Sequence, residues 1–338
     1  MSQSSRNADA VLQASPETVI WGAIDAARKP VLHVRAGQTV RIDTVSQQPL
    51  NHADPATFFP ANGIRADEVL PEHSAIYHQV KKSPPGGPHV LTGPVYIDGA
   101  EPGDMLEVRV LDVAFRVPYG MNAIGPGSGV LPDLMKERIA PVFRLDLERR
   151  VAVVGGRVEV PLAPFMGIMA VAPPPERSPW STKPPAEWGG NIDFRHMIAG
   201  STLYLPVFNK GALFYTGDGH ATQGDGEVDG AAIEISLAPT FEFHVHKNAG
   251  KRMKWPRAED ASHHYVMGMD EDLDIALKEA VREAVEFLEH ETGVTAAQAY
   301  ALCSFKVDFR VGEAVNQVKM VYGAIPKGLL ARGKSFQP

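Results

Sequence analysis

The stretch LYLPVFNKGALFYTGDGHATQGDGEVDGAAIEISL, residues 203–237, places a polar loop between two apolar segments. In the first segment Leu203, Leu205 and Val207 alternate with their neighbours, as in a strand with one buried face. The loop GDGHATQGDGE, at 217–227, has four glycines that allow tight turns. It also holds five side chains able to bind a metal, move a proton or bind a substrate: Asp218, His220, Gln223, Asp225 and Glu227. These residues alone support a functional loop and an ordinary solvated hairpin about equally.

The strand pattern recurs along the chain. Apolar residues alternate at 40–44 and at 106–110. At 151–160 two valine-rich runs flank Gly155-Gly156, which predicts a hairpin with a two-residue turn. The 338 residues include 31 glycines and 28 prolines, a composition that favours many short elements joined by turns over a helical bundle.

Helical periodicity is convincing only late in the sequence. Apolar residues recur at helical spacing over 273–288, with Asp270 as the expected N-cap and Gly293 as the stop. A capping-box spacing at Thr295 predicts a second helix through about Ser304. We therefore predict an α+β fold, mainly β, with a β-sandwich-like core and helices near the C-terminus.

The segment 173–185 contains six prolines and Trp180, so it cannot pair inside a sheet and should run over the surface. We expect residues 1–338 to form a single unit, with two lobes joined near 173–188 as the alternative arrangement.

Composition and charge exclude several classes of protein. There are 33 basic and 40 acidic residues, a net charge of -7, and no Lys/Arg-rich run, so we expect no nucleic-acid partner. No apolar run reaches the roughly 18 residues of a membrane span. The start MSQSSRNADAVLQASPETV lacks the apolar region of an export signal, and the one cysteine, Cys303, cannot form an internal disulfide. We expect a cytoplasmic protein.

Two further motifs bear on the chemistry. In FEFHVHK, strand alternation puts His244 and His246 on one face, an arrangement some metallohydrolases use, but an ordinary polar strand is the simpler interpretation. Cys303 falls on an apolar helix, where a buried thiol is expected, and this disfavours a cysteine nucleophile. A serine nucleophile is disfavoured too, because the sequence has no G-x-S-x-G elbow.

GDGHATQGDGE resembles the signature of the acetamidase/formamidase family, and other family-like segments flank it in the expected order. They are HVLTGPVYIDGAEPGDMLEVRVLD at 89–112, PFMGIMAVAP at 164–173, GGNIDFRHMIAGSTLYLPVF at 189–208 and YVMGMDEDLDIALKEAV at 265–281. The resemblance covers nearly the whole chain. It implies a hydrolase of small amides with a mostly β fold and some helices, a homo-oligomeric state and, as in some members of the family, a divalent metal such as zinc or calcium.

The family's motifs also imply site residues. Those that match are His89, Asn191, Asp193, His220, Gln223 and Glu227. Two departures concern the pocket: Val90-Leu91 replaces the usual Pro and variable residue, and 40–50 lacks an acidic residue followed by a Gly-Gln pair. The substrate is therefore expected to differ from acetamide or formamide, and a γ-lactam is one such variant.

The resemblance suggests a division of roles. Our hypothesis is that His89, Asp193 and His220 hold a divalent metal, zinc or alternatively calcium, which lowers the pKa of a bound water. Glu227 would take the proton and pass it to the departing nitrogen. The catalytic set is then Glu227, Asp193 and His220. If the metal is structural, a carboxylate such as Glu227 would act on water directly.

Asn191 and Gln223 are expected to orient the substrate amide. The expected partners are a small amide and further copies of the chain. The alternative function is a metal-dependent carbohydrate-binding β-sandwich without catalysis, because Asp/Gly-rich loops on such folds also bind sugars.

Overall fold

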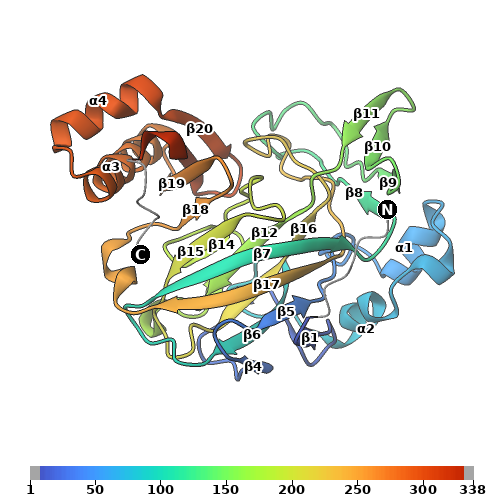
Figure 1. Cartoon of the computed structure of the whole chain (residues 1–338). Helices are drawn as coiled ribbons and strands as arrows, with labels where there is room; N and C mark the ends of the chain where they lie inside the picture. Colours follow the sequence, from blue (N-terminus) through green and yellow to red (C-terminus); the bar gives the residue numbers. More distant parts are fainter. Residues whose placement is uncertain (1–7, 331–338) are drawn as a thin grey trace.

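A computed structural model describes residues 8–330 of the protein, and strands form its centre (Figure 1). The larger of its two main sheets has nine strands in the order β1-β5-β17-β7-β15-β18-β19-β21-β20. Their bounds, in this order, are Ala10–Leu12, Thr39–Ile42, Leu237–His246, Met105–Phe115, Thr202–Pro206, Arg257–Glu259, His263–Asp270, Lys319–Pro326 and Asp308–Glu313. The long strands β7 and β17 lie side by side, antiparallel, across its middle.

The second main sheet has the order β14-β12-β16-β6-β2, with β4 also beside β6. These strands span Gly189–Asn191, Phe165–Val171, Phe214–His220, Val90–Ile97, Val19–Trp21 and, for β4, Leu32–Val34. Both β12 and β16 are buried along their whole length, since the strands carry no exposed side chain. Such continuous burial is typical of strands covered on both faces.

The two main sheets share one apolar core. At their contact, the ring of Phe214 in β16 lies 5.4 Å from that of Phe241 and 5.1 Å from that of Phe243, both in β17. All three rings are buried. This packing of sheet on sheet confirms the prediction of a mainly β fold with a sandwich-like core.

Two smaller sheets complete the β structure of the described residues. One has the order β11-β10-β9-β8, and the other pairs β13 with β3. Their bounds are Val158–Pro161, Val151–Val154, Val142–Asp146, Tyr119–Met121, Trp180–Ser181 and Ala23–Ile24. Strands β10 and β11 confirm the predicted hairpin, in which Gly155 and Gly156 have φ of 59° and 68°. The predicted two-residue turn is wrong by one residue, because Val154 pairs with Val158 and Arg157 also lies in the turn.

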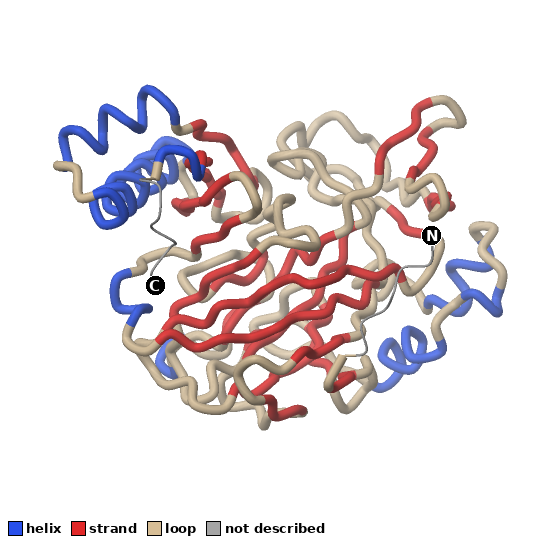
Figure 2. Tube along the Cα trace, viewed as in Figure 1, coloured by secondary structure: helices blue, strands red, loops and turns tan. Residues whose placement is uncertain are grey.

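The two predicted helices are α3, Leu273–Thr292, and α4, Ala296–Lys306. They pack together over strands β19 to β21 at one side of the molecule (Figure 2). The predicted N-cap is wrong by two residues, because Asp272 rather than Asp270 accepts hydrogen bonds from the first helical N–H groups. Asp270 instead ends β19 and accepts a hydrogen bond from the Asp272 N–H. The second helix starts with the predicted capping box at Thr295.

Two other helices were not predicted: α1, Pro55–Ala61, and α2, Pro71–Gln79. Each is about two turns long and begins with proline, and α1 contains a second proline, Pro60. Such short segments give too few repeats for an amphipathic pattern to be read. They lie across the molecule from α3 and α4 (Figure 2). In the described part of the chain, short 3₁₀ turns occupy Ala66–Glu68, Pro175–Arg177, Ala249–Arg252 and Lys327–Leu329.

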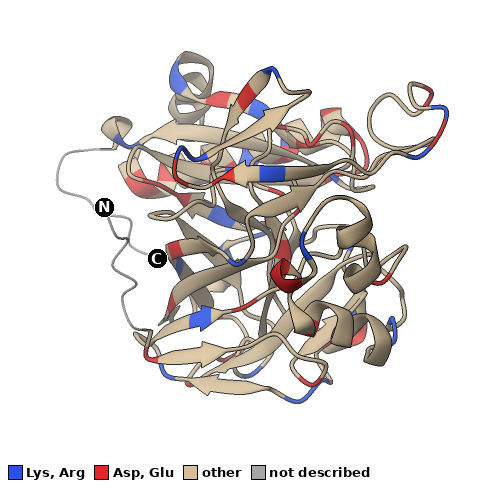
Figure 3. Ribbon diagram, turned by 90° about the vertical axis from the view of Figure 1, so that its right-hand side faces the viewer, with Lys and Arg blue, Asp and Glu red and all other residues tan. Residues whose placement is uncertain are grey.

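In residues 8–330 no helix is both long and apolar enough to cross a membrane. Lys and Arg positions are interspersed with Asp and Glu along the ribbon (Figure 3).

Candidate active site

Strand register brings several expected site residues to one end of the smaller main sheet. Ile168 of β12 pairs with Asn191 of β14 and with Gly217 of β16, and Leu91 of β6 pairs with the same Gly217. Four polar residues lie at or next to these paired positions: His89, Asn191, Asp193 and His220. Segments more than a hundred residues apart in the sequence therefore meet at one place.

Buried carboxylates surround His220 at this place. The distances from His220 Nε2 are 3.4 Å to Asp218 Oδ1 and 3.5 Å to Glu234 Oε1. Glu227 Oε1 lies 3.9 Å away and Asp193 Oδ1 4.0 Å away. All five residues are buried, and His220 is 0% exposed. We call these five residues, together with the buried Glu313, the acidic cluster.

A glycine makes space for the cluster. A Cβ added to Gly167, in β12, would lie 2.4 Å from Asp193 Oδ1 and 2.7 Å from Asp218 Oδ2. The carbonyl of Gly167 also accepts a hydrogen bond from the Asp193 N–H, at 3.2 Å. Any side chain at 167 would occupy the position of the carboxylates, which explains glycine in the segment PFMGIMAV.

Three of the cluster's acids have an unusual backbone conformation. Asp193, Asp218 and Glu227 have φ of 43°, 60° and 45°, in the left-handed region that residues other than glycine rarely adopt. Such strain persists only where the surrounding structure enforces it, and it concentrates at functional sites.

Gln47 and His89 border the cluster. The Nε2 of Gln47 donates to Asp218 Oδ1 at 2.6 Å and to Glu234 Oε2 at 2.7 Å, which separates two carboxylates that would repel each other. His89 Nδ1 lies 3.1 Å from the carbonyl oxygen of Thr182, and a carbonyl can only accept, so Nδ1 carries the proton. His89 Nε2 lies 3.6 Å from Asp218 Oδ2.

Burial controls the protonation of the acids. It raises the pKa of Asp193 well above its ordinary value, and repulsion from Glu227 and Asp218 adds to the effect. Burial likewise raises the pKa of Glu227 well above its ordinary value, although His220 opposes the shift. The pKa values of Glu234 and Glu313 rise to about 8, again mainly because of burial.

The pKa values of Asp218 and His220 shift so that each side chain favours its charged form. Burial acts to raise the pKa of Asp218, but the neighbouring His89 and His220 outweigh it and hold that pKa below its ordinary value. Burial also acts to lower the pKa of His220, but Glu234 and Asp218 raise it to about 10. No Lys or Arg within residues 8–330 forms an ion pair with these carboxylates. Among the described residues the cluster therefore has no Lys or Arg counter-ion, and His220 is the cationic side chain within it.

The donor set fits a divalent cation. Asp193 Oδ1 and both ring nitrogens of His220 are buried without a hydrogen-bond partner. Two overlapping groups have ligand atoms within 4.8 Å of one another: Asp193, His220 and Glu227, and Asp218, His220 and Glu234. One imidazole with carboxylates is a combination that zinc and related ions accept. Of the expected ligands, Asp193 and His220 are together, whereas His89 lies beside Asp218 and belongs to neither group.

A cavity of about 270 Å³ leads to the cluster. Its lining includes Gln47, His89, Lys183, Asn191, Asp218, Glu227, Glu234 and Asn316. Asn191 Oδ1 is buried without a partner, so its side chain is free to accept a hydrogen bond from a ligand. Polar groups that converge on a small buried space are typical of a site that orients a small polar molecule.

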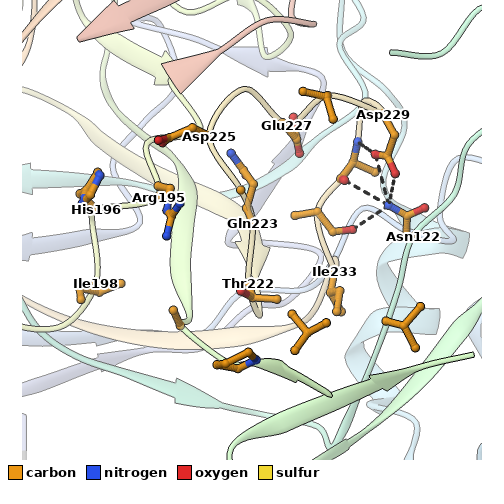
Figure 4. A pocket seen from close by; sticks show the side chains of 18 of the residues that line it. Asn122, Arg195, His196, Ile198, Thr222, Gln223, Asp225, Glu227, Asp229 and Ile233 are labelled. Carbon is orange, nitrogen blue, oxygen red and sulfur yellow. Dashed lines mark hydrogen bonds between the residues drawn. The ribbon is translucent and has the colours of Figure 1, made fainter. Parts of the chain in front are cut away.

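Gln223 does not line this cavity. Its Nε2 donates to the backbone carbonyl of Asp193 at 2.9 Å. Gln223 instead borders a second cavity, of about 810 Å³, together with Arg195, His196 and Asp225 (Figure 4). Glu227 lines both cavities.

Sequence reasoning missed four residues of the site: Gln47, Glu234, Glu313 and Asn316. Glu234 interrupts the apolar run AAIEISL, and Glu313 lies in the strand segment VGEAV, so a charge among apolar residues was a usable signal. Gln47 and Asn316 carried none, because isolated amides in loops are common.

Among the described residues, neither His244 nor His246 belongs to a group of three or more possible metal ligands. His244 Nε2 lies 2.5 Å from Glu242 Oε1, and His246 Nε2 lies 2.5 Å from Glu107 Oε2. Both imidazoles are partly exposed on β17. This agrees with the simpler interpretation of an ordinary polar strand.

The fold is β-rich, and the site combines a buried acidic cluster suited to a cation with a small polar cavity that leads to it. The chain belongs to the Acetamidase/Formamidase family, whose sequence profile matches residues 74–178 and 175–330.

The chain is also similar to individual proteins named as acetamidases and formamidases. The chain is 27% identical to an acetamidase of Mycolicibacterium smegmatis, covering 46% of this chain and 53% of the relative. It is 25% identical to a formamidase of Methylophilus methylotrophus, covering 63% and 70%. A solved acetamidase structure from Bacillus halodurans superposes with a TM-score of 0.77 at 27% identity, covering 94% of this chain and 98% of that one. The match spans only about half the length of the Mycolicibacterium acetamidase.

Proposed function

We propose that this protein hydrolyses the carbon–nitrogen bond of a small amide, releasing a carboxylate and ammonia, or an amino acid where the substrate is a γ-lactam. The observation that carries the proposal is the acidic cluster, with its unpaired ligand atoms, at the end of a small polar cavity. Membership of the family and the activities named for its relatives support it. They do not favour the alternative, a carbohydrate-binding module.

Amide hydrolysis sets three requirements. The carbonyl is a weak electrophile and the nitrogen a poor leaving group, so the reaction needs an activated water, charge stabilisation at the carbonyl oxygen and a proton for the nitrogen. We propose Asp193, Asp218, His220 and Glu234 as the residues that hold a divalent ion, zinc in the first instance. When bound, such an ion supplies Lewis acidity in a site that excludes most water.

Glu227 is the proposed general base. Its carboxylate lies farther from His220 Nε2 than those of Asp218 and Glu234, at 3.9 Å against 3.4 and 3.5 Å. It also borders the cavity, from a loop rather than from the strand that carries His220. Burial and the neighbouring acids raise the pKa of Glu227, and a cation bound in the cluster would offset this effect. As a carboxylate, Glu227 can then take a proton from water and return it to the departing nitrogen.

Two amides have separate roles in this proposal. Asn191 Oδ1, unpartnered at the cavity, would accept a hydrogen bond from the substrate amide N–H. Gln223 acts through its hydrogen bond to the Asp193 carbonyl, so we now propose that it positions Asp193 instead of binding the substrate.

Substrate assays test the proposal. Metal-loaded protein should release ammonia from formamide, acetamide or a longer primary amide, or open a γ-lactam. Folded, metal-loaded protein that attacks none of these compounds, assayed in parallel with an active relative, would end it.

A further inference from the structure

The turn after strand β20 reaches into the site from the other main sheet. β20 belongs to the nine-stranded sheet, whereas His220, Asp218 and Asn191 lie on the six-stranded one. At this turn Glu313 is 0% exposed and Asn316 is 8% exposed, and Asn316 also lines the cavity. The site is therefore built from both layers of the sandwich.

The turn is held rigidly on both sides. Within it, Glu313 Oε1 accepts hydrogen bonds from the backbone N–H groups of Val315 and Asn316. Across it, the Gly226 N–H donates to the Gly312 carbonyl at 2.9 Å, and the Ala314 N–H donates to the Gly226 carbonyl at 3.1 Å. Gly226 directly precedes Glu227, so the turn and the loop of the proposed base are fixed to each other.

Asn316 makes a direct contact with the cluster, because its Nδ2 donates to Asp193 Oδ2. Among residues 8–330, Asn316 is the side chain that donates a hydrogen bond to this carboxylate. The other oxygen, Asp193 Oδ1, is buried, has no partner and lies 4.0 Å from His220 Nε2. The contact thus leaves one particular oxygen of Asp193 facing His220.

We propose that Asn316 is a positioning residue that fixes the Asp193 carboxylate so that Oδ1 is presented to a divalent cation beside His220. The inference rests on the proposed function, since it assumes that Asp193 is a ligand. Outer partners of this kind hold a ligand in one orientation, and their loss typically weakens metal affinity or activity by about 10- to 100-fold.

A competing interpretation is that Asn316 binds the substrate, because it borders the cavity. The two roles differ in what they change. A positioning residue affects metal affinity and kcat and leaves KM nearly unchanged, whereas a substrate contact raises KM and leaves metal affinity alone.

The experiment compares Asn316→Ala and Asn316→Leu with wild type and with Asn209→Ala. Leu keeps the approximate size of Asn without a donor, so it carries the test if the Ala variant fails to fold. Asn209 is the control because its Nδ2 also makes two hydrogen bonds, to the carbonyls of Ala172 and Pro173, but it does not line the cavity. For each protein, the Zn²⁺ dissociation constant is measured by competition with a chelator, and kcat and KM are measured with an amide substrate.

The Asn316 variants should bind Zn²⁺ about 10- to 100-fold more weakly, with a lower kcat and little change in KM, while Asn209→Ala matches wild type. Unchanged Zn²⁺ affinity in the Asn316 variants would overturn the inference, whether or not KM rises. A wild type that hydrolyses amides without any divalent ion would also overturn it and leave the hydrolysis standing. A metal-binding wild type that is inactive on every amide would instead overturn the proposed function, and the Zn²⁺ affinities would still decide the role of Asn316.

Discussion

Asp104 and Asp193 are both buried aspartates, 3% and 1% exposed, but their surroundings shift their pKa values in opposite directions. Asp104 accepts hydrogen bonds from the Lys247 ammonium and from the backbone N–H groups of Glu101 and Asn248. Burial acts to raise its pKa, but these donors outweigh burial and hold the pKa below its ordinary value. Asp193 has one neutral donor and several acidic neighbours, and its pKa is raised.

The two aspartates differ in whether the chain itself supplies a positively charged partner for the buried carboxylate. A buried carboxylate costs several kcal/mol unless it is paired and hydrogen-bonded. Around Asp104 the chain supplies that pairing. Around Asp193 it gathers further carboxylates with no Lys or Arg partner among the described residues, an arrangement that an external cation would stabilise. The predictions below test this contrast.

The largest effect is expected at Glu227. Glu227→Gln keeps the size of the side chain but cannot take a proton, so kcat should fall by about 10²- to 10⁴-fold with the metal content unchanged. Steady-state kinetics and elemental analysis of the same preparation measure both. Loss of bound metal along with activity would make Glu227 a ligand, and an unchanged kcat would remove it from the reaction.

The space beside Asp193 is the next target. In Gly167→Ala the new methyl group would displace the carboxylates of Asp193 and Asp218, so metal affinity and activity should fall by at least about 10- to 100-fold. Gly224→Ala is the matched control, because nothing lies within 4 Å of a Cβ at that position. If both variants keep wild-type metal affinity, the close packing around Asp193 is irrelevant to binding.

The metal-free protein should respond to pH. Glu234 and Glu313 have folded pKa values of about 8, above their value of 4.5 in an unfolded chain, so between these limits the folded state binds more protons. Its free energy of unfolding should therefore fall as pH rises from about 5 to 8. Denaturant titrations at several pH values measure this change, and the free energy of unfolding of Glu313→Gln should depend less on pH than that of wild type. A stability that rises over this range in the metal-free wild type would contradict the raised pKa values.

The smallest effect is expected at the paired aspartate. Asp104→Asn loses the ion pair with Lys247 but keeps a hydrogen-bonding oxygen, so the protein should lose about 1 kcal/mol of stability without any change in kcat. In the metal-free protein Asp193→Asn should do the reverse and raise stability, because it replaces an acid buried among other acids with a neutral amide. Thermal unfolding of both variants gives the comparison. Equal destabilisation by the two substitutions would contradict the claim that Asp104 stabilises the metal-free protein whereas Asp193 destabilises it.

Much of the fold follows from local patterns in the sequence. The hairpin at 151–160 and helices α3 and α4 were predicted because alternation, Gly-Gly turns and capping residues act over a few positions. The N-cap was misplaced because two aspartates, Asp270 and Asp272, stand two residues apart and either spacing suits a cap. Helices α1 and α2 are too short to show a periodicity.

The site was predictable only in part. Asp193, His220 and Glu227 lie in motifs of recognisable spacing, and the structure brings them together. Glu313 and Asn316 join them through a pairing of Gly226 with strand β20, a long-range contact that no local pattern encodes. The direction of Gln223 could not be read either, since a loop rich in glycine leaves side-chain orientation open.

The central claim is that the acidic cluster holds a divalent cation on which amide hydrolysis depends. The most direct measurement is the elemental analysis of purified protein, followed by chelation and re-addition of Zn²⁺ while ammonia release from an amide is recorded. Close to stoichiometric metal, loss of activity on chelation and its return with Zn²⁺ are predicted. Full activity in protein shown to contain no divalent metal would contradict the claim.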